Sequence, residues 1–233
     1  MCGICGILYI DGTPAQREEV VPMLETLLHR GPDQGDIVVD GSCALGNRRL
    51  AILDLSPNGA LPMRSADDRL IIAYNGEIYN HPILRHNLEL EGARYRSGSD
   101  TETLLKLYRR NGVDMLRSLR GMYAFALWDR DERRLLLARD RMGEKPLYYY
   151  ADDRVIVFAS EIKALLAHPA VPQRIGAGRA QAGAVPGIRL HPRAGDGVPG
   201  HQGADAGALR RDRSDVGREI EAALVLDAAD AGR

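Results

Sequence analysis

Hydrophobic residues recur along most of the chain in short runs, and their spacing alternates between two periods. Runs with aliphatic or aromatic residues at every second position, or in unbroken stretches, predict strands. The predicted strands are Ile4–Ile10, Asp36–Val39, Cys43–Gly46, Leu50–Asp54, Leu70–Tyr74, Met122–Trp128, Arg134–Ala138, Leu147–Tyr150 and Val155–Ala159. Apolar positions at helical spacing predict helices over Val20–His29, His81–Glu91, Thr101–Asn111 and Glu161–His168. This alternation favours a layered α+β domain built on antiparallel sheets.

The helix predicted over Thr101–Asn111 has the clearest boundaries. Its apolar stripe lies within Leu104–Tyr108. Asp100 or Thr101 precedes the stripe as an N-cap candidate, and Gly112 follows it as a stop.

The last quarter of the chain has a different composition. Residues 174–233 are dominated by Ala, Gly, Arg, Asp and Pro, with no aromatic residue after Phe158 and no lysine after Lys163. Such a segment buries too little apolar surface to offset the entropy lost on ordering, which is about 1–2 kcal/mol per backbone residue. Only Val216–Leu226 has a helical pattern. We therefore predict a folded domain over residues 1–173 and a low-complexity, disordered tail over residues 174–233.

Charge and cysteine content exclude several classes of protein. With 31 Lys and Arg against 32 Asp and Glu, the formal net charge is −1, which favours neither a nucleic-acid nor an anionic membrane partner. The apolar runs are shorter than the ~20 residues of a membrane span, and the first residues lack the basic start of a secretory signal. Three cysteines are too few to predict a disulfide framework. Cys2 and Cys5 lack a second Cys/His pair, so a metal site is not predicted either. A cytoplasmic location is expected.

Cys2 is the strongest candidate for a catalytic residue. Removal of Met1 would place a thiol and a free α-amino group on one residue. The amine has an ordinary pKa of about 7.7–8.0 and could accept the proton of the thiol, so that one residue supplies both nucleophile and base. Cys2 also precedes an apolar strand, which would hold it within a sheet. Cys5 and Cys43 are interpreted as small buried residues.

Four polar segments accompany Cys2, and each alone has an ordinary structural explanation. Asn-Gly commonly forms a hairpin turn, Ser-Asp-Thr-Glu commonly caps a helix, and an Arg-Arg pair commonly lies on a solvent-exposed face. The segments are HRGPD at 29–33, NRRLAI at 47–52, NGEIYN at 75–80 and GSDTE at 98–102.

Together these segments resemble the class II, N-terminal-nucleophile glutamine amidotransferase domain, specifically that of glutamine-hydrolysing asparagine synthetases. The resemblance runs from Met1 to about Ile175 and rests on MCGICGI, LHRGPD, RRLAILDL, YNGEIYN, SGSDTETLL, LRGMYAFALWD, RDRMGEKPLYYY and FASEIKALL, in the family's order. It implies the four-layer αββα sandwich of N-terminal-nucleophile hydrolases.

The resemblance also implies catalytic roles. Cys2 would attack the side-chain amide of L-glutamine and form a thioester that water hydrolyses. The side chain of Asn75 and the backbone N–H of Gly76 would donate hydrogen bonds to the oxyanion.

Substrate-binding roles follow by the same resemblance. Arg49 would hold the glutamine carboxylate, with Arg48 as the alternative on the opposite face of an extended chain. Asp100 and Glu77 would bind the ammonium group. Leu50 and Leu53 would contribute contacts to the pocket.

The cluster of Arg139, Asp140 and Arg141 is interpreted as structural, forming part of a contact with a downstream domain in relatives.

The sequence departs from the family in one respect. The S-G-G-x-D-S pyrophosphate loop of the ATP-dependent synthetase domain does not occur. ATP and magnesium would belong to that domain, so no cofactor is expected for this chain. The resemblance ends near Gln173–Gly176, where composition also shifts, and we hypothesise a frameshift or truncation of a longer gene. A separate synthetase partner or a homodimer is expected.

Three functions compete at this point. The first is a glutaminase, the second an inactive binding module that keeps the fold, and the third a truncated, non-functional remnant. Joint retention of Cys2, Arg49, Asn75, Gly76 and Asp100 favours the first.

Overall fold

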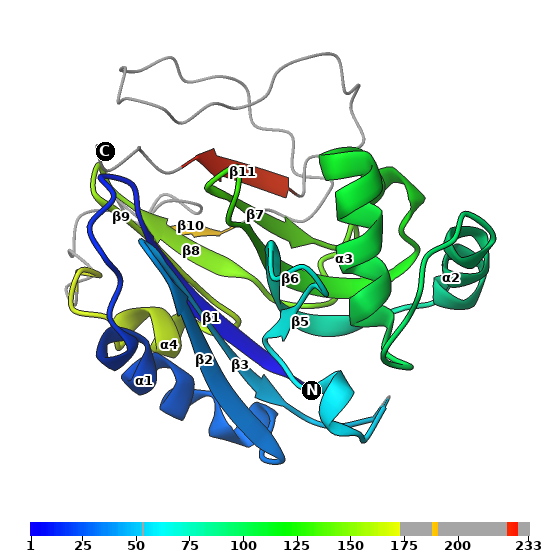
Figure 1. The fold of residues 1–233 in the computed structure, drawn as a ribbon. Helices are drawn as coiled ribbons and strands as arrows, with labels where there is room; N and C mark the ends of the chain where they lie inside the picture. Colours follow the sequence, from blue (N-terminus) through cyan, green and yellow to red (C-terminus); the bar gives the residue numbers. More distant parts are fainter. Residues whose placement is uncertain (53, 173–187, 191–222, 228–233) are drawn as a thin grey trace.

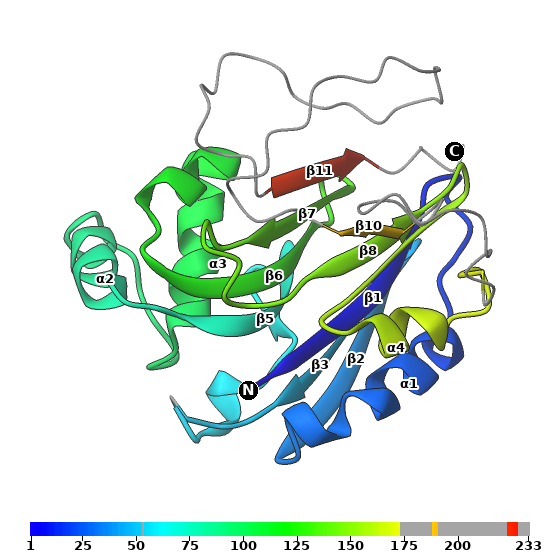
Figure 2. The same ribbon diagram turned by 180° about the vertical axis from the view of Figure 1, so that it is seen from behind.

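The computed structural model describes residues 1–52, 54–172, 188–190 and 223–227. Two antiparallel sheets pack face to face, and helices cover the outer face of each (Figures 1 and 2). The order of layers is therefore helices, sheet, sheet, helices, as the αββα prediction requires.

The first sheet has the strand order β10-β8-β9-β1-β3-β2, and every pairing within it is antiparallel. Its central strand, β1, pairs with β9 on one edge and β3 on the other. The strands are β1 (Gly3–Tyr9), β2 (Gln34–Asp40), β3 (Cys43–Arg49), β8 (Tyr148–Ala151), β9 (Val155–Ala159) and β10 (Ile188–Leu190).

The second sheet has the order β11-β7-β6-β5-β4 and is also antiparallel. Its longest pairing joins β5 to β6, with Leu70 opposite Asp129 at one end and Ile78 opposite Gly121 at the other. The strands are β4 (Met63–Arg64), β5 (Leu70–Ile78), β6 (Gly121–Asp129), β7 (Arg134–Arg139) and β11 (Ala223–Asp227).

The two outer layers consist of different helices. On the first sheet lie α1 (Arg17–Thr26) and α4 (Ile162–Leu166), which pack on each other and on β1, β3 and β9. The second sheet is covered by α3 (Asp100–Asn111), with α2 (His81–Leu90) against it. Short 3₁₀ helices occur at η1 (Leu28–Arg30), η2 (Pro57–Gly59) and η3 (Gly112–Ser118).

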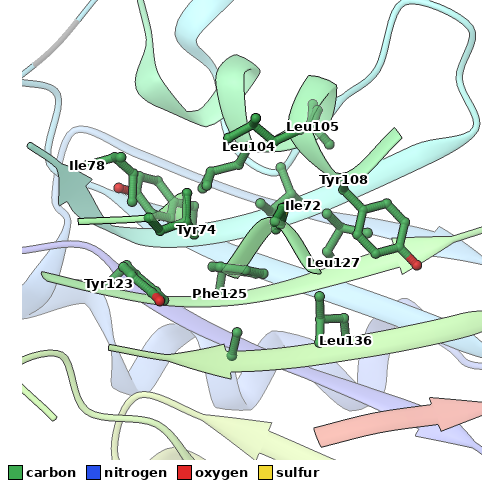
Figure 3. Packing of buried hydrophobic residues seen from close by; sticks show 14 of the residues in the cluster. Ile72, Tyr74, Ile78, Leu104, Leu105, Tyr108, Tyr123, Phe125, Leu127 and Leu136 are labelled. Carbon is green, nitrogen blue, oxygen red and sulfur yellow. The ribbon is translucent and has the colours of Figure 1, made fainter. Parts of the chain in front are cut away.

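Side-chain alternation along the strands assigns each residue to a layer. On β1, Ile4 and Leu8 join the core between the sheets, whereas Cys5 and Ile7 pack under α1 and α4. On β5, Ile71 and Ala73 face the core between the sheets. The intervening β5 residues pack against α3, where the labelled side chains interdigitate (Figure 3).

Most of the predicted elements are present, with boundaries shifted by a few residues. The strand predicted over Leu50–Asp54 is wrong among its described residues, because the chain leaves the sheet after Arg49. The Ala51 N–H donates to the Asp33 carboxylate at 2.9 Å, and Asp54 has φ +52°. Backbone groups that bond to side chains in this way are not available to pair with a neighbouring strand.

The N-cap of α3 also differs from the prediction. Ser99 is the cap, and its Oγ accepts from the Thr101 N–H at 3.2 Å. Asp100 is thus a helical residue. Gly112 ends the helix with φ +55°, as predicted.

Most of the predicted disordered tail lies outside the described residues. Two short strands are described within it: β10 pairs with β8, and β11 pairs with β7. The helical pattern noted over Val216–Leu226 does not correspond to a helix at residues 223–226, which belong to β11, while 216–222 lie outside the described residues. A short apolar run does not distinguish strand from helix by spacing alone, and pairing with β7 decides here.

Candidate functional site

Cys2 lies immediately before the central strand β1, beside the end of β3. Figures 1 and 2 show the N-terminal end of the chain at the start of β1. Its sulfur accepts a hydrogen bond from the Leu50 N–H at 3.4 Å, and the thiol is 3.7 Å from the Leu50 carbonyl oxygen. Its carbonyl oxygen accepts from Arg30 Nε at 3.0 Å. Cys2 thus lies just outside the sheet, next to the first residue of β1, and is held there by Leu50 and Arg30.

Burial raises the pKa of the Cys2 thiol above its ordinary value. The Leu50 hydrogen bond and the positive charges of the amino terminus, Arg49 and Arg30 lower this pKa and oppose the effect of burial. Met1 precedes Cys2 in the structure, so the Cys2 nitrogen is an amide nitrogen in this form.

Strand alternation directs Cys2 and Asn75 to the same space. Continuing the β1 pattern one step beyond Ile4 assigns Cys2 to the gap between the sheets, and continuing the β5 pattern beyond Ala73 assigns Asn75 to that gap. Asn47 bonds to both Gly3 and Tyr74, the chain neighbours of Cys2 and Asn75, so we infer that the two side chains lie at the same end of the core between the sheets.

Asn75 has an unused hydrogen-bond donor at this position. Its side chain is buried, and Nδ2 has no hydrogen-bond partner among the described residues. Since a buried amide donor without a partner is destabilising, such an atom is a candidate to bind a ligand.

The backbone N–H of Gly76 is directed away from β6. Tyr123, its register partner, receives a hydrogen bond from the Asp140 N–H at 2.8 Å and donates its own N–H to the Asp140 carboxylate at 3.2 Å. Both polar groups of Tyr123 thus face β7, and the antiparallel pattern places Gly76 in a non-hydrogen-bonded pair with it.

The N–H groups of two nearby residues show that this edge of β5 bonds to side chains and not to another strand. The Tyr74 N–H donates to Asn47 Oδ1 at 2.7 Å, and the Ile78 N–H donates to Asp100 Oδ2 at 2.9 Å. Gly76 lies between them with the same orientation, and among the described strands β4 pairs only with Ile71 and Ile72. The Gly76 N–H therefore points to an open edge of the sheet.

Arg49 and Arg48 point to opposite faces of β3, as predicted. Arg48 donates from Nε to the Leu24 carbonyl of α1 at 3.3 Å. Arg49 is buried, and its Nη2 donates to the Asp54 carbonyl oxygen at 2.5 Å. Arg49 is thus on the Cys2 and Asn75 face, held by the loop that follows β3.

That loop also reaches the start of α3. Asp54 accepts a hydrogen bond from the Gly98 N–H at 2.7 Å, and this bond and that of Ser56 Oγ lower the pKa of Asp54. Leu50 contacts Cys2 directly, as described above. The predicted site residue Leu53 lies outside the described residues.

Asp100 is a buried carboxylate next to the same site. Its Oδ2 accepts from Tyr74 Oη at 2.7 Å as well as from Ile78 N–H. Burial raises the pKa of Tyr74, and the charges of Asp100, Cys2 and Glu77 add to that rise. These four residues therefore share one electrostatic neighbourhood, in which Glu77 is exposed.

The site also includes residues to which the sequence analysis gave no role. Asn47 bonds to β1 and β5, and Glu161 pairs with Arg30 at 2.9 Å. Asn47 belongs to the NRRLAI segment, but nothing in the sequence indicates which strands its side chain joins.

The Arg139–Arg141 cluster agrees with its structural interpretation at Asp140. The Asp140 carboxylate accepts from the Glu144 and Lys145 N–H groups, both at 2.9 Å, and so holds the turn before β8. Cys5 and Cys43 are buried, as predicted.

Within the described part of the chain, no group of three or more His, Cys, Asp or Glu side chains is arranged to hold a metal ion. None of the described helices has both the length and the apolar character that crossing a bilayer requires.

Comparisons with known proteins place this geometry in context. Residues 1–182 match a family model described as a glutamine amidotransferase domain. Asparagine synthetase (glutamine-hydrolysing) 1 of Bacillus subtilis is 40% identical over 169 residues, which are 71% of this chain and 27% of that protein. Asparagine synthetase B of Escherichia coli is 38% identical over 170 residues, which are 71% of this chain and 30% of that protein. The chain thus spans less than a third of the length of these two relatives.

A solved structure has a similar fold. Glutamine phosphoribosylpyrophosphate amidotransferase of B. subtilis, complexed with ADP and GMP, superposes with a TM-score of 0.60 and 26% identity. The match covers 71% of this chain and 43% of that one.

Proposed function

Because the chain belongs to the glutamine amidotransferase domain family, we propose that it hydrolyses L-glutamine to L-glutamate and ammonia with Cys2 as nucleophile. The observation that carries this proposal is the pair of donors beside Cys2. Asn75 Nδ2 is buried without a partner among the described residues, and the Gly76 N–H points to an open sheet edge. Both donors are neutral, so neither requires desolvation of a charge.

The reaction begins once Met1 has been removed. The freed α-amino group of Cys2 accepts the thiol proton, and the sulfur attacks the side-chain amide carbon of glutamine. Collapse of the tetrahedral intermediate breaks the carbon–nitrogen bond, and the leaving nitrogen takes the proton and departs as ammonia. Water then attacks the thioester, which releases glutamate and restores the thiol.

The oxyanion of each tetrahedral intermediate accepts hydrogen bonds from Asn75 Nδ2 and the Gly76 N–H. Donors held by a strand need no rearrangement as charge develops, and losing one such donor typically costs about 2.7–4 kcal/mol of transition-state stabilisation. Gly76 has a second constraint, since a Cβ there would lie 2.4 Å from the Met122 carbonyl oxygen. The backbone of β5 can therefore approach β6 only without a side chain at this position.

Recognition of glutamine uses charges on both sides of Cys2. The Arg49 guanidinium binds the α-carboxylate, and Asp100, with Glu77, binds the α-ammonium group. Leu50 shapes the pocket next to the sulfur, and we extend this role to Leu53 because it belongs to the same RRLAILDL sequence segment. The hydrolysis needs no cofactor, because the thiol, the amine and the amide donors supply every step.

The ammonia has a proposed destination. The relatives named above are asparagine synthetases more than three times as long as the matched segment, so we propose that a synthetase activity consumes the ammonia. A second copy of this chain is the alternative partner.

Glutamate release by the purified full chain tests the proposed hydrolysis. Mass spectrometry first establishes that Met1 has been removed. We expect wild-type turnover, a loss of at least about a thousandfold in Cys2→Ala, and near wild-type activity in Cys43→Ala, a buried thiol outside the site. Activity surviving in Cys2→Ala contradicts the role of Cys2 as nucleophile. No activity in wild type lacking Met1 contradicts the proposed hydrolysis and favours a binding module or a non-functional remnant.

A further inference from the structure

Asn47 is a fully buried polar side chain that bonds to both sheets. It lies on β3, on the face of the core between the sheets. Its Nδ2 donates to the Gly3 carbonyl oxygen at 3.3 Å and to the Arg48 carbonyl oxygen at 3.0 Å. Its Oδ1 accepts from the Tyr74 N–H at 2.7 Å.

The two backbone groups that Asn47 joins are next to the reacting residues. Gly3 follows the nucleophile Cys2, and Tyr74 precedes the oxyanion donor Asn75. One side chain thus connects the backbone beside the attacking sulfur with the backbone beside the group that receives the charge.

Apolar side chains pack between the sheets beside these bonds. Ile4, two residues after Cys2, and Ala73, two residues before Asn75, belong to the core between the sheets. Apolar contact is not directional and permits small sliding of one sheet over the other, whereas hydrogen bonds fix distance and angle. The Asn47 bonds therefore supply a restraint that the core alone lacks.

We propose that Asn47 is a positioning residue that sets the separation between Cys2 and the Asn75–Gly76 donors without touching glutamine. This inference rests on the proposed glutaminase function. Reacting groups must meet within a few tenths of an ångström, and misplacement by about 1 Å can reduce a rate a hundredfold. Removing Asn47 should therefore lower kcat and leave KM nearly unchanged, because Arg49 and Asp100 remain in place.

Two variants remove different parts of the connection. Asn47→Leu has a similar volume and loses all three bonds, whereas Asn47→Asp keeps the acceptor for Tyr74 but loses the donor to Gly3. If the leucine variant does not fold, the aspartate variant still tests the bond to the β1 side.

Ser160 offers a matched control. It is fully buried, and its Oγ accepts from the Ile4 N–H at 3.0 Å, so it also holds β1 but only within the first sheet. Ser160→Ala should lower Tm comparably to the Asn47 variants while kcat stays within about twofold of wild type.

Steady-state kinetics and crystal structures of all four proteins, with Met1 removed, complete the test. We expect kcat to fall about 10- to 100-fold in both Asn47 variants with KM within twofold, and the Cys2–Asn75 Cα distance to shift in them alone. Unchanged kcat, or an equal loss in Ser160→Ala, overturns the positioning role. If wild type is inactive, the glutaminase proposal fails, and the Cα distances alone decide whether Asn47 sets this separation.

Discussion

The Leu50 N–H lies 3.4 Å from the Cys2 sulfur, although 48 residues separate them in the chain. The contact exists because β3 pairs with β1, so that the loop leaving β3 passes the start of β1. The thiol is consequently enclosed by backbone and guanidinium groups, while burial raises its pKa.

Alkylation of Cys2 should therefore depend on pH in a defined direction. The thiolate is the reacting form, and the raised pKa leaves less of it at neutral pH than in the unfolded chain. In the chain that retains Met1, iodoacetamide should react more slowly with Cys2 than in urea, with a rate rising above pH 8. Arg49→Met should slow the reaction further, because a positive charge that lowers the thiol pKa is lost.

Cys5 and Cys43 provide internal controls for this measurement, since both are buried and burial raises the pKa of each. Peptide mapping should find them unmodified in the native chain. Faster labelling of Cys2 in the folded than in the unfolded state would contradict the inferred enclosure.

Asp100→Asn should weaken glutamine binding and destabilise the fold. The amide removes the charge that pairs with the substrate ammonium, so KM should rise about tenfold or more. It also disturbs the bonds from Tyr74 and Ile78, which should lower the free energy of unfolding by about 1–3 kcal/mol. Kinetics and urea titration measure the two effects separately.

Glu102→Gln is the matched control on the same helix. Glu102 is buried and accepts from the Arg96 and Ser97 N–H groups, so its loss should also destabilise the fold. Its bonds belong to the segment before α3, and KM should stay within about twofold of wild type. An equal rise of KM in both variants would mean that destabilisation, not ammonium binding, explains the effect.

Gly76→Ala should impair both stability and turnover. Its Cβ would lie 2.4 Å from the Met122 carbonyl oxygen, which forces β5 away from β6 and costs about 1–3 kcal/mol. The displaced N–H should lower kcat at least about tenfold. Gly92→Ala, with φ +91° and no atom within 4 Å of its Cβ, should cost about 1 kcal/mol and leave kcat unchanged. Thermal unfolding and glutamate release on both variants check the contrast.

The stability of the fold should decrease in acid partly through Glu161. Burial acts to raise the pKa of Glu161, but hydrogen bonds from Arg30, His29 and Lys163 outweigh it and lower the pKa to about 2. The folded pKa lies below the unfolded one of about 4.3, so this contribution is full above the unfolded value. It is lost as pH falls from there towards 2.

Urea unfolding of wild type and Glu161→Gln between pH 7 and pH 2.5 measures this contribution. The difference in unfolding free energy should be constant above pH 5 and shrink below pH 4.5. A difference that stays constant down to pH 2.5 would contradict the assigned ion pairs.

Local pattern predicted most elements of this fold, and one of its errors lies where side chains replace a neighbouring strand as hydrogen-bond partner. Leu50–Asp54 has the apolar content of a strand, yet its backbone bonds to Asp33 and Cys2. At α3, the sequence offered two N-cap candidates, Asp100 and Thr101, and the structure caps the helix with Ser99. That choice leaves the Asp100 carboxylate available to Tyr74 and Ile78.

The sequence by itself determined a layered α+β domain through local spacing, and the family through short segments of fixed composition. The resemblance to that family then implied the αββα class and the residues for amide hydrolysis. Only the tertiary structure decided that Arg49 rather than Arg48 faces Cys2, that the Asn75 amide donor has no partner among the described residues, and that Asn47 connects the two sheets. These relationships join strands far apart in the chain. Sheet packing and register create them, and neither is encoded in the periodicity of any single segment.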